Sequence, residues 1–244
     1  MAKLINVVKA TGEIEPFSEE KVVSSLMRAG ASKGLAYKIV DKVKSQLYQN
    51  IPTFEIYSAV MKILRREQKD LASRYSLKRA IMELGPTGYP FEIFVAGVLE
   101  ADGFKVQNNM MVLGKCVSHE VDIVAKKDKK THMVECKFHN QLGGRTEIKP
   151  ALYTYARFLD LRERGFDLPW LVTNTKVTQE VRAYCLCMGM EVTSWDYPEG
   201  KSLRELVDKS DLQPLTSLTS LTKKQKQSFL EQGIVFAKDL PRTS

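Results

Sequence analysis

The sequence predicts a multidomain protein of mixed α+β and α/β class. Three observations lead to this prediction. A short strand pair and four helical stretches occupy residues 1–86, an α-β-β-β-α-β-α-β order of elements follows over residues 89–200, and a small helical tail covers residues 201–244. A Pro- and Gly-rich joint at residues 85–90 separates the first two parts. At 244 residues the chain is long enough for two or three small domains.

The N-terminal part is predicted to be a β-hairpin that caps a helical domain. Residues 5–9 and 13–17 flank Thr11-Gly12, a turn signal between two short strands. Ser18 is a good N-cap for a helix that carries two glutamates in its first turn and ends at Gly30. Three further helices are expected at residues 32–50, at 54–68 after a Thr53 cap, and at 71–84.

The central part begins with a helix and continues with strands. Residues 91–104 have the pattern of an amphipathic helix ended by glycine, and Glu92 lies near its start. Two short strands are expected on either side of a turn at Asn108-Asn109. After a hairpin described below, the pattern predicts a helix at residues 147–164, a strand at 170–173, a helix to residue 188 capped by Thr178, and a strand at 191–195.

The stretch between His119 and Lys137 predicts a β-hairpin. Two β-branched runs, residues 121–124 and 133–137, flank a polar turn at residues 126–130. Hairpins of this kind pair antiparallel strands, so each side chain of one run faces a defined side chain of the other.

This hairpin would carry an acidic face. If it is symmetric about Asp128-Lys129, Asp122 lies directly across from Glu135, with Cβ atoms roughly 5 Å apart. Strand alternation puts Lys137 on the same face as Glu135. Two carboxylates and an ammonium are the ingredients of a divalent-metal phosphoryl site. The alternative is an exposed hairpin with a charged outer face.

These residues resemble the PD-(D/E)xK nuclease superfamily, specifically its Mrr-like restriction endonucleases and archaeal Holliday-junction resolvases. In those families a helix with a glutamate ends in Gly-Phe, and an Asp strand and a Glu-x-Lys strand follow. The matching residues here are Glu92, Asp122, Glu135 and Lys137. The resemblance implies that Asp122 and Glu135 hold Mg²⁺ or Mn²⁺, with the Cys136 carbonyl as a further ligand. It also implies that Lys137 positions the attacking water and that Glu92 orients a metal-bound water or adds a ligand.

Residues 8–17, with Lys21 and Ala29 downstream, resemble the ATP-cone, the nucleotide-binding regulatory domain of ribonucleotide reductases and their repressors. The resemblance implies that Lys9 and Lys21 meet the phosphates of ATP or dATP. Four further side chains would lie around the nucleoside: Glu15, Ser18, Thr53 and Tyr57. Independently of any family, two lysines from two elements can converge on an anion. The alternative is that both are ordinary solvated lysines.

The net charge of +8 is unevenly distributed. Residues 1–88 hold 15 Lys and Arg against 9 Asp and Glu, whereas residues 89–200 hold 14 against 15. The positive excess therefore lies where an anionic ligand could use it, and charge alone gives no argument for DNA binding by the central part.

Several other side chains near the acidic hairpin have two interpretations. His119 and His139 flank the strands and could touch a metal or a phosphate, but a lone histidine is more often structural. Lys149, Tyr153 and Arg157 lie four residues apart on one face of a predicted helix. They would either track a phosphate backbone or form a solvated face.

The cysteines and the hydropathy pattern indicate a cytoplasmic protein. The four cysteines are too few and too scattered for a disulfide framework, and Cys185-Leu186-Cys187 lacks a second pair for a zinc site. No stretch of about 18 uncharged apolar residues is present, so no membrane partner is expected.

The tail suggests a small nucleic-acid-binding or packing module. Thr222 can cap a helix at residues 223–232, Gly233 ends it, and residues 234–240 would form a second helical turn. This resembles a helix-hairpin-helix module; an appendage that only packs is the equal alternative.

Together these observations predict a metal-dependent DNA endonuclease. Its partners would be DNA and an adenine nucleotide that alters the state of the whole chain, with homo-oligomer contacts as the usual route of such regulation. The chain has no GxxxxGK[ST] phosphate loop, so nucleotide hydrolysis is not expected. The alternative function is a non-catalytic, nucleotide-responsive DNA-binding regulator.

Overall fold

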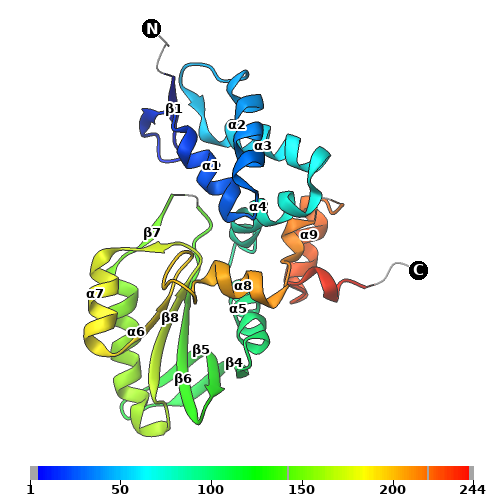
Figure 1. Cartoon of the computed structure of the whole chain (residues 1–244). Coiled ribbons are helices and arrows are strands. Elements are labelled where there is room, and N and C mark those ends of the chain that lie inside the picture. The colour runs from blue at the N-terminus through cyan, green and yellow to red at the C-terminus, as the bar shows by residue number, and fades with distance from the viewer. Residues whose placement is uncertain (1–4, 142, 219, 242–244) are drawn as a thin grey trace. The chain divides into compact units, whose positions relative to one another are not determined.

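A computed structural model describes residues 5–141, 143–218 and 220–241 (Figure 1). The chain divides into two compact units, Met1–Lys78 and Arg79–Ser244. The predicted mixed α/β class is confirmed. The finer division at residues 86–89 and 200–201 stays a prediction.

The first unit contains the predicted hairpin. Strands β1 (Asn6–Val8) and β2 (Ile14–Pro16) pair antiparallel, with Val7 opposite Glu15. A strand that was not predicted, β3 (Ile51–Pro52), pairs parallel to β1 and places Val8 beside Pro52. The hairpin therefore supplies two strands of a three-stranded sheet in the order β2-β1-β3, with β1 in the centre.

The four predicted helices of the N-terminal region are present, with two corrections. Ser18 caps the first as expected, since its Oγ accepts the Lys21 N–H. The second helix ends at Lys44 and not at residue 50, because the chain turns there to bring β3 against β1; Asn50 has a φ of 62°. Thr53 is the first helical residue rather than the cap. The bounds are α1 (Glu19–Arg28), α2 (Lys33–Lys44), α3 (Thr53–Glu67) and α4 (Lys69–Met82).

The second unit is built on a five-stranded mixed sheet in the order β10-β8-β6-β5-β4. The β4-β5-β6 half is antiparallel, and β8 and β10 extend it in parallel beside β6. The strands are β4 (Lys105–Leu113), β5 (Ser118–Lys127), β6 (Lys130–Lys137), β8 (Leu168–Thr173) and β10 (Glu191–Thr193). This is the predicted order of elements.

Helices cover both faces of this sheet (Figure 1). Helices α6 (Ile148–Leu161) and α7 (Gln179–Met188) pack on one face, and α5 (Tyr89–Ala101) with α8 (Leu203–Ser210) on the other. A short 3₁₀ helix, η1 (Arg162–Arg164), continues α6. Two strands that were not predicted form a small parallel pair: β7 (Arg145–Thr146) and β9 (Lys176–Val177).

The hairpin has the predicted symmetry. Residues pair from Lys127 with Lys130 to Ile123 with Val134, so the turn consists of Asp128 and Lys129. Both turn residues are left-handed, with φ of 51° and 63°, the backbone signature of a type I′ turn. The strands extend further toward the turn than predicted, because the lysines continue the ladder.

The turn predicted at Asn108-Asn109 is wrong. Strand β4 runs through both residues, and Asn109 adopts a left-handed φ of 50° within it. Asparagine tolerates this conformation better than most residues because its side chain can hydrogen-bond locally. Here the side chain bonds to two carboxylates described below.

After α8, the described residues of the tail form one more α-helix and two 3₁₀ turns: α9 (Lys223–Glu231), η2 (Leu215–Ser217) and η3 (Ala237–Asp239). Thr222 caps α9 as predicted. The tail packs on α5: the Phe236 and Phe94 rings lie 5.4 Å apart, and a Cβ on Gly97 would come within 2.5 Å of Phe236. Glycine at position 97 is thus required for this close approach.

The cysteines are unpaired, with Cys136 and Cys185 buried. Within the described ranges, no helix combines the length and apolar character needed to cross a bilayer.

Candidate active site and nucleotide site

The acidic site forms where β5 and β6 separate. Their ladder ends at the pair Ile123 and Val134; the next pair would be Asp122 and Glu135. In place of a backbone bond, Asp122 Oδ2 accepts the Cys136 N–H at 2.7 Å. Because the N–H and C=O of a strand residue point to the same edge, the Cys136 carbonyl belongs to this edge of β6 as well.

Glu92 reaches the same site from the first turn of α5. The Phe91 and Phe138 rings pack 5.5 Å apart, which holds the start of α5 beside the end of β6 and so beside Lys137. Asn109 Nδ2 donates to Glu92 Oε2 at 3.2 Å and to Glu120 Oε1 at 3.3 Å. Asn109 and Glu120 are therefore part of the site, although the sequence pattern did not assign them to it.

The pKa values of the three carboxyl groups are all raised. Burial raises the pKa of Glu135 to about 7, and the Asp122 charge adds to this; Arg157 and Lys137 oppose it. Burial and then the Asp122 charge also raise the pKa of Glu92. The pKa of Asp122 rises through burial, against the lowering effect of its Cys136 hydrogen bond and of Arg157. Glu92 and Glu135 therefore sense the negative charge of Asp122, and Asp122 that of Glu120, in a partly desolvated place.

Arg157 is the buried counter-charge of this site. Its side chain, on α6, donates from Nη1 to Glu135 Oε2 and lies 5.4 Å from the centre of the Tyr153 ring. Only 8% of Arg157 is exposed, whereas Tyr153 and Lys149 face solvent. The prediction of one continuous phosphate-tracking or solvated face is thus wrong for Arg157, which points into the acidic site.

The two flanking histidines have structural partners. His119 Nε2 lies 2.8 Å from Asp160, whose oxygens also accept the Cys116 and Val117 N–H groups; these bonds, His119 first, lower the pKa of Asp160. His139 Nε2 lies 3.0 Å from Thr146 Oγ1.

Asn174 fixes the chain just after Lys137. Its side-chain amide accepts the His139 N–H at 2.9 Å and donates to the His139 carbonyl at 2.7 Å. Both backbone polar groups of His139, its N–H and its carbonyl, are thereby hydrogen-bonded to the Asn174 side chain.

The donor set fits a hard divalent cation. Such ions take carboxylate and carbonyl oxygens, which Asp122, Glu135 and Cys136 supply. Three carboxyl groups with raised pKa values share one buried guanidinium, so a further positive charge would relieve their repulsion. In the described part of the chain, no three Asp, Glu, His or Cys side chains form a metal-holding group. The donor set of Asp122, Glu135 and Cys136 differs from such a group because its third oxygen belongs to the backbone.

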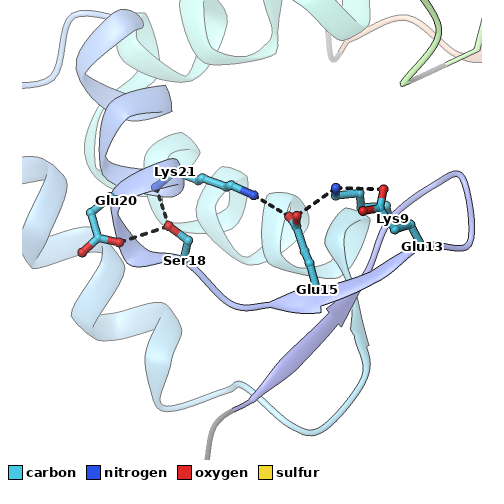
Figure 2. A network of polar contacts seen from close by, with 6 residues as sticks. All are labelled: Lys9, Glu13, Glu15, Ser18, Glu20 and Lys21. Atoms are coloured by element: carbon cyan, nitrogen blue, oxygen red, sulfur yellow. Dashed lines mark hydrogen bonds and ion pairs between the residues drawn. The ribbon is translucent and has the colours of Figure 1, made fainter.

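Four of the predicted nucleotide residues lie close together in the first unit: Lys9, Glu15, Ser18 and Lys21 (Figure 2). Glu15 on β2 bridges Lys9 Nζ at 2.8 Å and Lys21 Nζ at 2.7 Å, and Glu13 also pairs with Lys9 at 3.0 Å. Lys21, and then Lys9, lower the pKa of Glu15, while Glu15 and Glu13 raise the pKa of Lys9. Figure 2 also shows the Ser18 hydroxyl between Glu20 and the start of α1.

The predicted residues Thr53 and Tyr57 lie in the first turns of α3, which directly follows β3. The parallel register of β1 and β3 pairs Val8 with Pro52, so Lys9 and Thr53 are the next residues in line. Tyr57 lies one turn along α3 and stacks on Tyr75, with ring centres 5.5 Å apart and an interplanar angle of 14°.

A family model described as restriction endonuclease matches residues 85–206, half of the chain. The chain belongs to the restriction endonuclease family. A second model, described as ATP cone domain, matches residues 5–83, and a third, AF1548-like, C-terminal, matches residues 214–244. The predicted fusion of an ATP-cone with an Mrr-like restriction endonuclease domain is confirmed.

Similar proteins match a little over half of this chain. An uncharacterized protein of Archaeoglobus fulgidus is 41% identical over 146 residues, which are 60% of this chain and 83% of that protein. The crystal structure of a protein of unknown function, AF1548, superposes with a TM-score of 0.57 at 40% identity, covering 63% of this chain and 82% of that one.

Proposed function

We propose that the restriction endonuclease domain hydrolyses DNA phosphodiester bonds with Mg²⁺ or Mn²⁺. The observation that carries the proposal is the convergence of Glu92, Asp122 and Glu135 beside the strand end that bears Lys137. Their burial, together with the repulsion of Glu92 and Glu135 by the Asp122 charge, raises the pKa values of all three groups, and a bound cation would offset both effects.

Asp122, Glu135 and the Cys136 carbonyl would hold the metal ion. When bound, such an ion polarises the phosphate and stabilises the charge that develops on its oxygens. The Cys136 N–H keeps the Asp122 carboxylate in one orientation, and Arg157 does the same for Glu135.

Lys137 and Glu92 would serve the attacking water. The Lys137 ammonium can donate to that water and to a phosphate oxygen, so it both positions the nucleophile and stabilises negative charge. Glu92 can accept a hydrogen bond from the water on the other side. The bonds of Asn174 to the chain after Lys137 limit how far this strand end can move.

Cleavage by a Lys137→Ala variant tests this function. The assay uses linear, methylated, nicked and branched DNA with Mg²⁺ or Mn²⁺. We expect a loss of about 10²–10³ in rate, the usual cost of removing one such contact. Lys126→Ala is the matched control, because it removes the same charge at the turn end of the same hairpin.

Two outcomes of this assay argue against the enzyme. Equal cleavage by wild type and Lys137→Ala would assign the activity to another site or to a contaminant. DNA binding without cleavage on every substrate would favour the alternative, a non-catalytic, nucleotide-responsive DNA-binding regulator.

We also infer that the ATP-cone binds ATP or dATP and thereby shifts the association state of the chain. Lys9 and Lys21 would contact the phosphates, and the residues around the nucleoside would be Glu15, Ser18, Thr53 and Tyr57. Nucleotide can shift an association equilibrium only if it binds the two states unequally.

Calorimetric titration with ATP, dATP and GTP, beside sedimentation with and without nucleotide, tests this inference. The Lys9→Ala/Lys21→Ala double variant should lose binding. Lys33→Ala/Lys62→Ala, with the same change of charge at two exposed sites of α2 and α3, should retain it. Equal binding by both double variants would remove the sensor function.

A further inference from the structure

Glu15 occupies the position between the two lysines that are proposed to bind phosphate. Its Oε1 lies 2.7 Å from Lys21 Nζ and its Oε2 lies 2.8 Å from Lys9 Nζ. One carboxylate thus joins β2, the end of β1 and the first turn of α1 (Figure 2). We call Lys9, Glu15 and Lys21 together the Glu15 bridge.

The bridge places an anion where the proposed ligand would place one. A carboxylate that receives hydrogen bonds from two ammonium groups has the same partners that a phosphate oxygen would take. Because these contacts lower the pKa of Glu15 and raise that of Lys9, both groups are charged at neutral pH. Lys9 and Lys21 are therefore already paired with an anion before any ligand binds.

Backbone pairing keeps Glu15 at the site after any displacement. Glu15 is paired with Val7 in the β2-β1 ladder, so its side chain can rotate but its backbone cannot leave. The side chain of Lys21 is 64% exposed and that of Lys9 33%, so a ligand can reach both ammonium groups. A bound phosphate would then share the lysines with a nearby carboxylate that repels it.

We propose that Glu15 is an internal counter-anion that competes with the nucleotide for Lys9 and Lys21 and so limits how tightly the cone holds a phosphate chain. A ligand must replace two ion pairs and overcome the charge of Glu15. A triphosphate can contact both lysines at once, whereas a monophosphate has fewer oxygens and less charge with which to do so. The inference rests on the proposed nucleotide function and changes only the role given there to Glu15, from a residue near the nucleoside to a counter-anion for the lysines.

The competing role for Glu15 is a direct contact with the nucleoside, as the family resemblance implies. The two roles predict opposite effects of Glu15→Gln. If Glu15 holds the nucleoside, the variant binds ATP more weakly and inorganic tripolyphosphate unchanged. If Glu15 is the counter-anion, both ligands bind more tightly.

The experiment is calorimetric titration of the intact protein with AMP, ADP, ATP and inorganic tripolyphosphate at low salt. Wild type is compared with Glu15→Gln, and with Glu13→Gln as the matched control. Glu13 also pairs with Lys9, but its side chain is 64% exposed, whereas that of Glu15 is 21% exposed and bridges both lysines. Exposed ion pairs are weak, so we expect Glu15→Gln to tighten tripolyphosphate binding by about three- to tenfold. Glu13→Gln should have a smaller effect.

The outcomes separate this inference from the nucleotide function itself. Wild-type binding of ATP, with unchanged or weaker tripolyphosphate binding by Glu15→Gln, would overturn the counter-anion role and leave the sensor intact. No ATP binding by wild type or by Glu15→Gln would overturn both. Tripolyphosphate binding that appears only in Glu15→Gln would support the counter-anion role.

Discussion

Two glutamates in the two units respond to their surroundings in opposite directions. Burial raises the pKa of Glu135 in the endonuclease domain to about 7, whereas Lys21 and Lys9 lower the pKa of Glu15 in the cone. Both glutamates pair with a cation, so pairing alone does not decide the direction. Burial and the local ratio of charges decide it.

The difference indicates how each site would take up a ligand. Three carboxyl groups, those of Glu92, Asp122 and Glu135, share the buried charge of Arg157, and the site favours an added cation. In the cone, Lys9 and Lys21 are already matched by Glu15, so an added anion must compete. A metal ion is thus expected to bind the acidic site without displacing another group. A nucleotide is expected to bind the cone by displacing Glu15 from Lys9 and Lys21.

The largest expected effect is on cleavage by Asp122→Asn. The change removes a negative charge but keeps the side-chain shape, so cleavage should fall by about 10²–10³. The rise in Tm that Mg²⁺ or Mn²⁺ causes should also disappear. Asp128→Asn is the control, since asparagine tolerates the left-handed turn position in the same hairpin. A metal-induced rise that survives in Asp122→Asn would place the ion elsewhere.

Arg157→Met tests the acidic site by removing its buried positive charge. It leaves Glu135 partly buried without its counter-charge, which should lower the free energy of unfolding in EDTA by about 2–3 kcal/mol, below the usual cost for fully buried pairs. Mg²⁺ should restore part of the loss. Denaturant unfolding of this variant is compared with Arg162→Met, the same change in the exposed turn after α6. Equal stability of the two variants in EDTA would mean that the pair contributes little.

The raised pKa of Glu135 predicts a pH dependence. Between about pH 4.5 and 7 the folded protein keeps a proton that the unfolded chain releases, so this group lowers stability as pH rises through that window. Burial lowers the pKa of His139, which acts in the opposite sense near pH 6.5. The measurement is therefore the difference in Tm between wild type and Glu135→Gln in EDTA at several pH values. A difference that does not change between pH 4.5 and 7 would contradict the raised pKa.

The affinity for the metal ion should rise with pH as Glu135 loses its proton. Because the ion binds the carboxylate form, its stabilising effect should grow as pH rises toward 7 and level off above it. Mg²⁺ titrations of wild type at pH 5.5 and 7.5 measure this, and stronger binding at the lower pH would contradict it.

The smallest effect concerns Ser18, whose role as a helix cap is separable from any role in nucleotide binding. Ser18→Ala should lower the local stability of α1 by about 1 kcal/mol without nucleotide, because the Lys21 N–H loses its acceptor. Ser18→Asp should keep the cap but weaken ATP binding through its charge. Hydrogen exchange of the α1 amides measures the first effect, and unchanged exchange in Ser18→Ala would exclude the cap.

Short-range patterns in the sequence predicted much of this arrangement. The symmetry of the hairpin about Asp128-Lys129 follows from strand alternation and turn residues, and the structure confirms it. The sequence likewise predicted the helix N-caps Ser18, Thr178 and Thr222, because an N-cap hydrogen bond joins residues three positions apart.

The contacts that complete the two sites could not be predicted from the sequence. Arg157 and Glu135 are 22 residues apart and meet only because α6 packs on the sheet, so no spacing rule connects them. The β1-β3 pairing has two residues in each strand, too short for a periodic signal. Asn109 gave a turn signal because asparagine favours the left-handed conformation, which β4 accommodates without breaking.

Single-turnover DNA cleavage by the intact wild-type protein, titrated with Mn²⁺ and then with EDTA, tests the central claim most directly. The account predicts cleavage that requires the ion, stops with EDTA, and increases between pH 5.5 and 7.5 as Glu135 loses its proton. Cleavage that persists in EDTA would contradict the metal site. The absence of cleavage on every DNA form, with or without ATP, would contradict the endonuclease function itself.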